Sequence, residues 1–383
     1  MRLQDAAVAV LVDGRLEHDS RVQRQLEFLS GASRLVCIAR SDSPVKGVDY
    51  RVVRGETSTF SMKAKKALLT LRKDYDRVHD GRPYVIEAKK ILEAEKFDLI
   101  VANDIDTLPL AVKTASDTGC KVLFDAHEWA PGQFSDRILW RIFIQPYVGD
   151  ACRKYIPSAD AMITVCESVA KMYERDYGVR TEVITNAPQY EDRSPSPLTG
   201  NGTEIDLVYH GALNPNRKIE TMLDAIELLP PNYRMNLILI NHREKYARRL
   251  SGIYGRRCSF LVPVGPKEII GKINGFDIGL FLVPPVNVNL TYTLPNKIFE
   301  YIQARLAVVV GPSPEMAAVV RRYDIGEVAD DFSAEAFAEA ISRMSPARIA
   351  QCKANTAVAA LELCAEKNRE KFLKIVERVL EGA

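Results

Sequence analysis

The sequence predicts an α/β protein made of two Rossmann-like, doubly wound parallel-sheet domains that face a cleft. Short apolar runs without polar alternation recur along the chain, as expected for strands that are buried on both faces of a parallel sheet. Amphipathic helical patterns lie between these runs. Such repeated alternation is typical of parallel strands that are connected by crossover helices.

The predicted strands form two series along the chain. The first covers residues 6–12, 34–39, 98–102, 121–124 and 161–165, and the second covers residues 205–209, 235–240, 277–283 and 307–310. Helices are predicted at residues 21–29 and 217–229, and terminal helices within 346–382. Pro, Ser, Gly and Asn gather between the two series, as in a linker. We therefore predict a first domain at 1–187, a linker at 188–204, a second domain at 205–360 and a C-terminal helix at 361–383.

The composition is that of a globular protein with no overall preference for nucleic acid. Of 383 residues, 47% are hydrophobic and 27% are charged, and the formal net charge is only +2. The seven cysteines are odd in number and lack zinc-ligand spacing, so we expect reduced thiols and a cytoplasmic location. No apolar run reaches the length that a bilayer-spanning helix needs.

Polar and glycine-bearing loops follow several of the predicted strands. Asp13 follows the first strand, His127 comes shortly after the strand at 121–124, and Gly211 follows the strand at 205–209. In doubly wound sheets, ligands bind outside the carboxyl ends of the strands. Two such edges that faced each other would form a ligand-binding cleft.

The segment LPNKIFEY, residues 294–301, has the features of a helix start at such an edge. A helix N-terminus suits phosphate, and a carboxylate one turn into the helix, Glu300, could accept both hydroxyls of a ribose. Lys297 and Arg217 could add charge against a diphosphate. The alternative is an ordinary helix start with a solvated glutamate.

Several segments together resemble glycosyltransferase family 4, a group of retaining enzymes with the GT-B fold. LPNKIFEYIQA followed by VVVGPSPEM is similar to the nucleotide-sugar-binding segment of that family. VYHGALNPNRKIETMLDAI is similar to the first strand, phosphate loop and helix of its second domain. First-domain segments also agree in order: DSRVQRQLEFL, ANDIDTLPLAVKTA, KVLFDAHEW and ITVCESVAKMYERDYGV. The resemblance covers nearly the whole chain.

The resemblance implies a hexosyltransferase that uses a nucleotide sugar, with a UDP-sugar favoured over a GDP-sugar. The acceptor would be a glycan, a glycolipid or a surface polysaccharide, and the enzyme would need no cofactor and no metal. Glu300 would bind the donor ribose, and His127 would contact the transferred sugar or the donor phosphate. The final helix would cross back to the first domain. The other implied donor-binding residues are Gly211, Arg217, Lys218, Asn296 and Lys297.

One position departs from the family pattern. Many members carry two glutamates separated by seven residues, and Tyr292 stands at the place of the first. Backbone amides or Asn289 would then supply the sugar contacts. Two alternatives stay open: a sugar-nucleotide epimerase of the same fold, and a non-catalytic nucleotide-sugar-binding protein. A nicotinamide dehydrogenase is disfavoured, because no predicted strand is followed by GxGxxG.

Two further groups of polar residues have alternative interpretations. Asp13 and Arg21 flank the loop after the first strand and are candidates for acceptor or donor contact. Arg21 could instead pair with Asp19. Asp104 and Asp106 form a DxD pattern, but they precede a predicted helix, so we expect an N-cap rather than a metal site.

Residues 61–73 contain five basic and no acidic side chains, with leucines between them. A basic amphipathic helix can lie on an anionic membrane, which would make the protein peripheral at the inner face of the membrane. A solvated helix face is the alternative. The apolar run at 134–148 could add to such a surface, but core packing explains it more simply.

Overall fold

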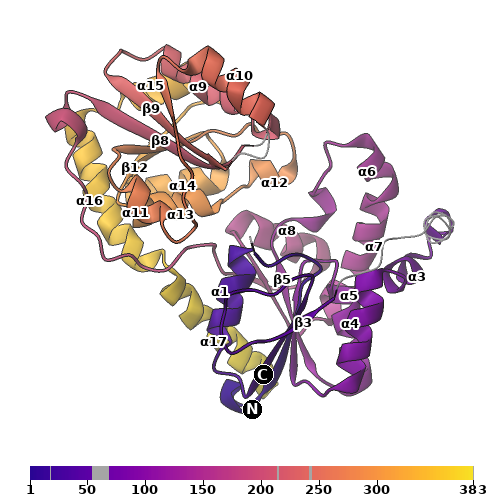
Figure 1. The fold of residues 1–383 in the computed structure, drawn as a ribbon. Helices are drawn as coiled ribbons and strands as arrows, with labels where there is room; N and C mark the ends of the chain where they lie inside the picture. The colour runs from indigo at the N-terminus through magenta and orange to yellow at the C-terminus, as the bar shows by residue number, and fades with distance from the viewer. Residues whose placement is uncertain (18, 54–68, 214, 241–243, 383) are drawn as a thin grey trace. The chain divides into compact units, whose positions relative to one another are not determined.

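The structure is a computed structural model that describes residues 1–17, 19–53, 69–213, 215–240 and 244–382. Lys63, Lys65 and Lys66 of the basic stretch lie outside these residues. The chain divides into two compact units (Figure 1). The first contains Met1–Thr185, Asn287–Asn289 and Arg369–Ala383, and the second contains Asn186–Val286 and Leu290–Asn368.

The first unit is built on a parallel sheet with the strand order β3-β2-β1-β4-β5-β6-β7. The order reverses between β1 and β4, and ligands of doubly wound sheets bind beyond the carboxyl ends of the strands at such a point. The strands are β1 (Ala7–Leu11), β2 (Arg34–Ala39), β3 (Asp49–Val52), β4 (Leu99–Asn103), β5 (Lys121–Ala126), β6 (Ala161–Thr164) and β7 (Thr181–Val183).

Helices cover both faces of this sheet (Figure 1). Helices α4 and α5 pack against each other on one side. Helix α1 lies on the other side, where Phe28 contacts Phe372 of α17 with ring centroids 5.8 Å apart. The helices are α1 (Ser20–Phe28), α3 (Tyr75–Asp80), α4 (Pro83–Ala94), α5 (Leu108–Thr118), α6 (Ile138–Phe143), α7 (Gln145–Tyr155) and α8 (Glu167–Tyr177).

The second unit has a parallel sheet with the order β10-β9-β8-β11-β12-β13, which is the classical order of dinucleotide-binding sheets. Its order reverses between β8 and β11. The strands are β8 (Ile205–Ala212), β9 (Tyr233–Ile240), β10 (Cys258–Leu261), β11 (Ile278–Phe281), β12 (Ala307–Val310) and β13 (Gly326–Val328). The two parallel sheets with crossover helices confirm the predicted fold class.

The helices of the second unit also lie in two layers. Helix α9 packs against α15, while α13 packs against α11 and α16. They are α9 (Ile219–Glu227), α10 (Glu244–Tyr254), α11 (Ile269–Ile273), α12 (Val288–Thr291), α13 (Asn296–Gln303), α14 (Pro314–Tyr323), α15 (Ala334–Ser342) and α16 (Pro346–Glu362). Helix α17 (Ala365–Glu381) begins in the second unit, and from Arg369 onward it belongs to the first. Among the described residues, no helix combines the length and hydropathy that crossing a bilayer requires.

One expectation about packing was wrong. The apolar run at 134–148 does not fill the core, because α6, which lies within it, has no buried residue. Helix α7, which follows directly, buries Val148, the last residue of the run, and then Ala151 and Cys152 beyond it.

Candidate functional site

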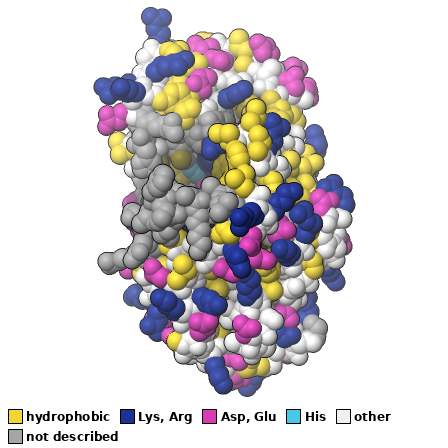
Figure 2. All heavy atoms as spheres, turned by 90° about the vertical axis from the view of Figure 1, so that its right-hand side faces the viewer, with side chains coloured by type: hydrophobic (Ala, Val, Ile, Leu, Met, Phe, Trp, Pro, Cys, Tyr) yellow, Lys and Arg dark blue, Asp and Glu magenta, His cyan; other side chains and the backbone are white. Residues whose placement is uncertain are grey.

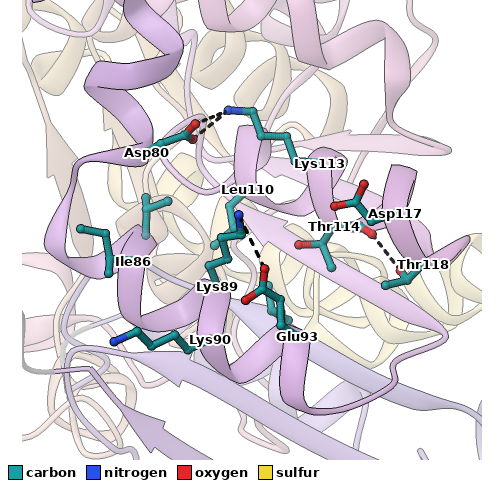
Figure 3. A pocket seen from close by; sticks show the side chains of 12 residues that line it. Asp80, Ile86, Lys89, Lys90, Glu93, Leu110, Lys113, Thr114, Asp117 and Thr118 are labelled. Atoms are coloured by element: carbon teal, nitrogen blue, oxygen red, sulfur yellow. Dashed lines mark hydrogen bonds and ion pairs between the residues drawn. The ribbon is translucent and has the colours of Figure 1, made fainter.

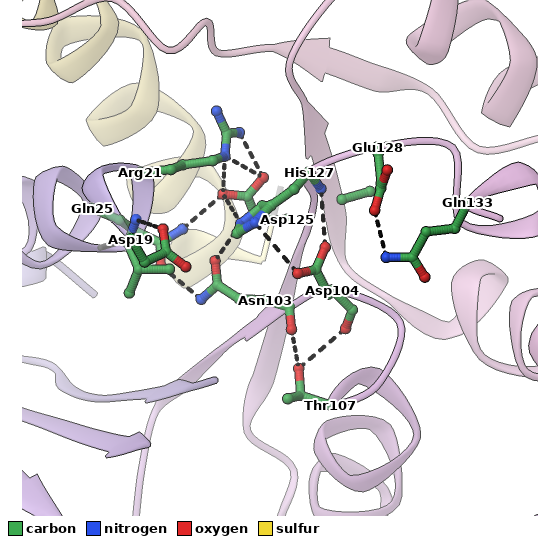
Figure 4. Close-up of polar contacts among 12 residues, drawn as sticks. Asp19, Arg21, Gln25, Asn103, Asp104, Thr107, Asp125, His127, Glu128 and Gln133 are labelled. Carbon is green, nitrogen blue, oxygen red and sulfur yellow. Dashed lines mark hydrogen bonds and ion pairs between the residues drawn. The ribbon is translucent and has the colours of Figure 1, made fainter. Parts of the chain in front are cut away.

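The carboxyl ends of β4 and β5 carry a buried polar network in the first unit (Figure 4). Arg21 of α1 forms a bidentate ion pair with Asp125 of β5, with 2.6 Å between Nη2 and Oδ1 and 2.9 Å between Nε and Oδ2. Its Nη1 donates to the carbonyl oxygen of Ile184 at 2.6 Å. Both side chains are buried, and Gln25 donates a further hydrogen bond to Asp125. Asp19, one of the two alternative partners considered for Arg21, instead caps α1 by accepting from the Val22 amide.

This network fixes the orientation of His127, which follows β5. The Asn103 amide nitrogen donates to Gln25, so the Asn103 Oδ1 atom faces the imidazole, and His127 Nε2 donates to it at 3.1 Å. On the other side of the ring, Nδ1 lies 3.4 Å from Asp104 Oδ2 (Figure 4). The side chain keeps 20% of its surface exposed, so a ligand can reach the ring.

Asp104 itself adopts a left-handed backbone conformation, with φ of +60°. Partial desolvation raises the pKa of its carboxyl, and nearby Asp125 and Asp106 add to this, against a lowering by His127. Thr107, and neither aspartate, occupies the N-cap of α5, so the capping expectation was wrong.

Glu128 is a site candidate that the sequence interpretation missed. Its carboxylate accepts from Gln133 Nε2 at 2.5 Å and from Asn289 Nδ2 at 2.8 Å. Desolvation, with a smaller contribution from Asp104, raises the pKa of Glu128 to about 7. The only sequence signal was a polar residue directly after His127. Asn289 also accepts from the Trp129 amide at 2.9 Å, so it is anchored within the first unit.

Asp13 lies in a chain of ion pairs next to this network. Its carboxylate contacts Arg40 Nε at 2.6 Å and also binds Arg82, which in turn binds Asp106. Only 3% of the Asp13 side chain is exposed. This buried pairing makes Asp13 a structural anchor of the loop in the present conformation.

The second unit gathers cations at the carboxyl end of β8. Gly211 has φ of +124°, and a Cβ atom there would lie 2.6 Å from the Cε atom of Lys297. The glycine thus makes room for the Lys297 side chain, which is only 8% exposed. The Lys297 ammonium lies 5.6 Å from the ring centroids of both Tyr209 and Phe281. Burial, and then the charge of Arg217, lower the pKa of Lys297 to about 7, against a smaller raising effect of Glu300.

Arg217 ends the short turn Pro215–Arg217 that leads into α9. Its Nη1 atom is buried and has no hydrogen-bond partner among the described residues. Lys218, the N-cap of α9, is exposed and has φ of +47°. The structure therefore brings Arg217, but not the exposed Lys218 ammonium, into a partly desolvated position.

Glu300 lies one turn into α13, where Ile298, Phe299 and Ile302 on other stripes of the helix are fully buried. Its side chain is 20% exposed, and Oε2 lies 3.3 Å from Nε2 of His210, without hydrogen-bond geometry. Burial, together with the charge of Lys297, lowers the pKa of His210 to about 3, so the imidazole is neutral. Glu300 therefore lies beside the neutral imidazole of His210 and close enough to Lys297 to affect its pKa.

The remaining predicted donor residues lie around α13. Asn296 is its first residue, and Tyr292 follows α12 directly; both side chains are half-buried. Pro295 is the N-cap of α13. At the same end of the unit, an open hollow of about 640 Å³ lies between α9 and α10 and is lined by Pro215, Glu220, Glu244, Lys245, Tyr246, Arg248 and Arg249.

Another groove lies outside these clusters. It is a hollow of about 380 Å³ between α4 and α5 (Figure 3). Four of its charged groups form ion pairs, Lys113 with Asp80 and Lys89 with Glu93. None of the predicted site residues lines it. Within the described ranges, no group of three or more His, Cys, Asp or Glu side chains is arranged to hold a metal ion.

Comparisons with known proteins agree with this architecture. Residues 46–187 match the model of Glycosyltransferase Family 4. HepE from Anabaena, solved in complex with UDP-glucose, is 16% identical, with a TM-score of 0.70 over 97% of this chain and 99% of that one. Sucrose-phosphate synthase from Thermosynechococcus elongatus is 15% identical, with a TM-score of 0.72 over 99% and 100%.

A third neighbour is a UDP-forming trehalose-phosphate synthase from Burkholderia xenovorans, 16% identical, with a TM-score of 0.67 over 98% of this chain and 99% of that one. No curated protein sequence matches the chain. The family match and the fold of these neighbours confirm both the resemblance inferred from the sequence and the enzyme class that it implies. The chain is a glycosyltransferase of the GT-B fold, and its residues 46–187 match the model of Glycosyltransferase Family 4.

Proposed function

We propose that this protein transfers a hexose from a nucleoside-diphosphate sugar to a glycan, glycolipid or surface-polysaccharide acceptor, with retention of configuration and without a metal ion. The nucleotide would lie at the carboxyl end of β8 and the N-terminus of α13. Glu300 would accept the ribose hydroxyls, and Lys297 and Arg217 would face the diphosphate.

The observation that carries this proposal is a pair of desolvated cations for which the described residues supply no anionic partner at ion-pair distance. Among the described residues, neither Lys297 nor Arg217 has a carboxylate within ion-pair distance, although Lys297 is buried and Arg217 Nη1 has no hydrogen-bond partner. Desolvated charges are costly unless they are paired. A bound diphosphate would supply the missing charge and the acceptor oxygens.

This arrangement also fits the transfer step. The bond between the sugar C1 atom and the β-phosphate oxygen breaks, and the acceptor hydroxyl oxygen forms the new bond to C1. The acceptor proton passes to the leaving phosphate. The two cations and the N-terminus of α13 would stabilise the charge that develops on the diphosphate, so these groups supply what a metal would otherwise provide.

UDP is the nucleotide we favour. Of the structural neighbours, HepE was solved with UDP-glucose, and the trehalose-phosphate synthase is UDP-forming. His127, held by Asn103 at the end of β5, would contact the transferred sugar. Replacing His127 with Ala should lower turnover while UDP affinity stays nearly unchanged, which steady-state rates and calorimetry on the same sample can check.

A thermal-shift experiment tests the nucleotide site directly. UDP, GDP, ADP, CMP and NAD would each be added with and without EDTA. A ligand at a hundred times its dissociation constant stabilises the folded state by about 2.7 kcal/mol. A shift with UDP that EDTA does not change supports the proposal. A shift that EDTA abolishes would contradict metal independence, and no shift with any nucleotide would contradict the donor site.

Incubation with a UDP-sugar alone separates the proposed reaction from its alternatives. Isomerisation of the free donor would identify an epimerase. Tight UDP binding with no transfer to any acceptor in a broad panel would favour a non-catalytic nucleotide-sugar-binding protein. For location, we propose a cytoplasmic protein that associates peripherally with the inner face of the membrane, as the basic residues at 61–73 suggest.

A further inference from the structure

Helix α6 in the first unit presents an apolar surface to solvent. None of its six residues is buried, and the side chains of Leu139 and Ile138 are 70% and 62% exposed. The other large apolar side chains that are exposed on or beside this helix are Phe134, Ile142, Phe143 and Ile144. Hydrophobic side chains gather on the face of the molecule that Figure 2 shows, next to Lys and Arg side chains. We call the exposed surface of residues 134–144 the α6 face.

Scattered exposed apolar residues are ordinary, but a contiguous set on one short helix marks an interaction surface. The neighbouring helix α7 buries Val148, Ala151 and Cys152, so it holds the segment on the unit. The α6 face is therefore exposed even though the helix that follows it packs against the rest of the first unit.

The charged residues of the α6 face favour an anionic partner, because basic side chains outnumber acidic ones. The face contains two basic residues, Arg137 and Arg141, and one acidic residue, Asp136. The Arg137 guanidinium lies 4.9 Å from the ring centroid of Phe134, and the Trp140 ring meets Phe134 edge-on at 6.2 Å. Helices that lie at the boundary between acyl chains and head groups typically combine leucine and isoleucine with Trp and Arg.

A polar recess opens directly beside this surface. A cavity of about 170 Å³ shares Phe143 and Ile144 with the α6 face. Its other lining residues include Arg82 and Asp106, which form an ion pair, and Tyr147. An apolar face next to a charged recess matches an amphiphilic surface, with hydrocarbon on one side and polar head groups on the other.

We propose that the α6 face is a membrane-docking surface that inserts into the head-group boundary of an anionic bilayer. The apolar side chains of α6 enter the upper acyl region, and Arg137 and Arg141 contact anionic head groups. Docking places the recess at Arg82 and Asp106 at the membrane surface. Only one consequence rests on the proposed transferase function, namely that the acceptor is then a glycan carried by a lipid.

Co-sedimentation of the full-length protein with vesicles tests this assignment. One set of vesicles contains phosphatidylglycerol in phosphatidylcholine, and the other contains phosphatidylcholine alone. We expect binding to the anionic vesicles. The double variant Leu139→Ser/Ile142→Ser should lose at least tenfold in partitioning, because two large apolar side chains are then no longer transferred from water into the bilayer. Neutralising Arg141 with Gln should cost roughly fivefold, and high salt should remove that difference.

The matched control uses exposed apolar residues of the second unit. Leu228→Ser and Ile253→Ser replace side chains of similar exposure outside the α6 face, and vesicle binding should stay unchanged. None of these positions is buried, so all variants should keep the melting temperature of the unmodified protein. UDP-induced thermal shifts are measured on the same samples, so loss of nucleotide binding is distinguished from loss of docking.

Three results would overturn the proposal. The first is absence of binding to either kind of vesicle. The second is binding that depends on Lys63, Lys65 and Lys66 but not on Leu139, Ile142 and Arg141. The third is a concentration-dependent dimer, seen by sedimentation velocity, that Leu139→Ser/Ile142→Ser abolishes, because the occupant would then be a second copy of the chain.

Discussion

The two polar clusters of this protein differ in how their charges are balanced. At the carboxyl ends of β4 and β5, Arg21 and Asp125 neutralise each other, and Gln25 and Asn103 complete the network. At the carboxyl end of β8, Lys297 and Arg217 have no carboxylate at ion-pair distance among the described side chains. The first cluster is satisfied by the protein alone, and the second is suited to receive an anion.

Because of this difference, removing one charged side chain should have a different effect in each cluster. Breaking a buried pair leaves an uncompensated charge in the folded state, so the cost falls on stability. Removing a cation that has no partner relieves desolvation in the free protein, so the cost falls on ligand binding. The predictions below separate these two effects.

The largest expected effect is on the stability of the first unit. Asp125→Asn leaves the buried Arg21 guanidinium without a balancing charge and should lower the free energy of unfolding by about 3–5 kcal/mol. Urea unfolding followed by circular dichroism measures this loss. The matched control is Asp49→Asn, which breaks an exposed pair with Arg51 and should cost less than about 1 kcal/mol. Equal losses in the two variants would contradict the structural role of the buried pair.

The next effect concerns the diphosphate. Lys297→Met and Arg217→Gln should each weaken UDP binding by roughly ten- to a hundredfold, which corresponds to about 1.5–3 kcal/mol for a charged hydrogen bond. Uridine binding should change little, because uridine has no phosphate. Calorimetric titration with both ligands measures the contrast, and Lys272→Gln on the surface of α11 is the control. A uniform loss for UDP and uridine would remove these residues from the phosphate site.

Glu300→Gln should give the complementary pattern. The variant should bind uridine and UDP about tenfold more weakly, about 1.4 kcal/mol, because the ribose is common to both ligands. Glu339→Gln, an exposed glutamate of α15, serves as the control in the same titrations. Unchanged affinity for both ligands in a folded variant would exclude the ribose role.

The smallest effect is a pH dependence of UDP binding. Lys297 has a pKa lowered to about 7, so the free protein loses this charge as the pH rises above that value. A bound diphosphate favours the charged form, so binding takes up a proton above pH 7 and affinity falls as the pH rises. The fall is at most tenfold per pH unit, since one pKa unit is about 1.36 kcal/mol.

Titration calorimetry in buffers of different ionisation enthalpy detects this proton uptake. Neutral His210 does not contribute near pH 7, because its pKa is lowered to about 3. Lys297→Met should abolish the proton uptake, and persistence of the same uptake in that variant would show that another group titrates.

The sequence correctly predicted the central strands of both sheets but missed the edge strands. The predicted strands correspond to β1, β2, β4, β5, β6, β8, β9, β11 and β12, whose residues are mostly buried. The four that were missed, β3, β7, β10 and β13, are the edge strands of the two sheets. Residues of β3 and β7 are partly or fully exposed, so these strands lack the continuous apolar run that identified the central strands.

The prediction that the apolar run at 134–148 packs in the core was wrong for a different reason. Its composition predicts burial, but hydropathy alone does not show whether a neighbour exists to cover the side chains. Among the described residues, no element covers the apolar side chains of α6, and none of its residues is buried. Glu128 was missed because its raised pKa arises from desolvation, which depends on atoms distant in the sequence.

The sequence by itself determined the two parallel sheets and the candidate residues that follow their strands, because apolar runs and strand ends are local features. Tertiary structure alone decided the partners of those residues. Arg21 meets Asp125, 104 residues further along the chain, and Lys297 of α13 passes over Gly211 of β8. Charge balance and desolvation depend on such contacts between distant segments, and they decide which cluster supports the fold and which is suited to bind a diphosphate.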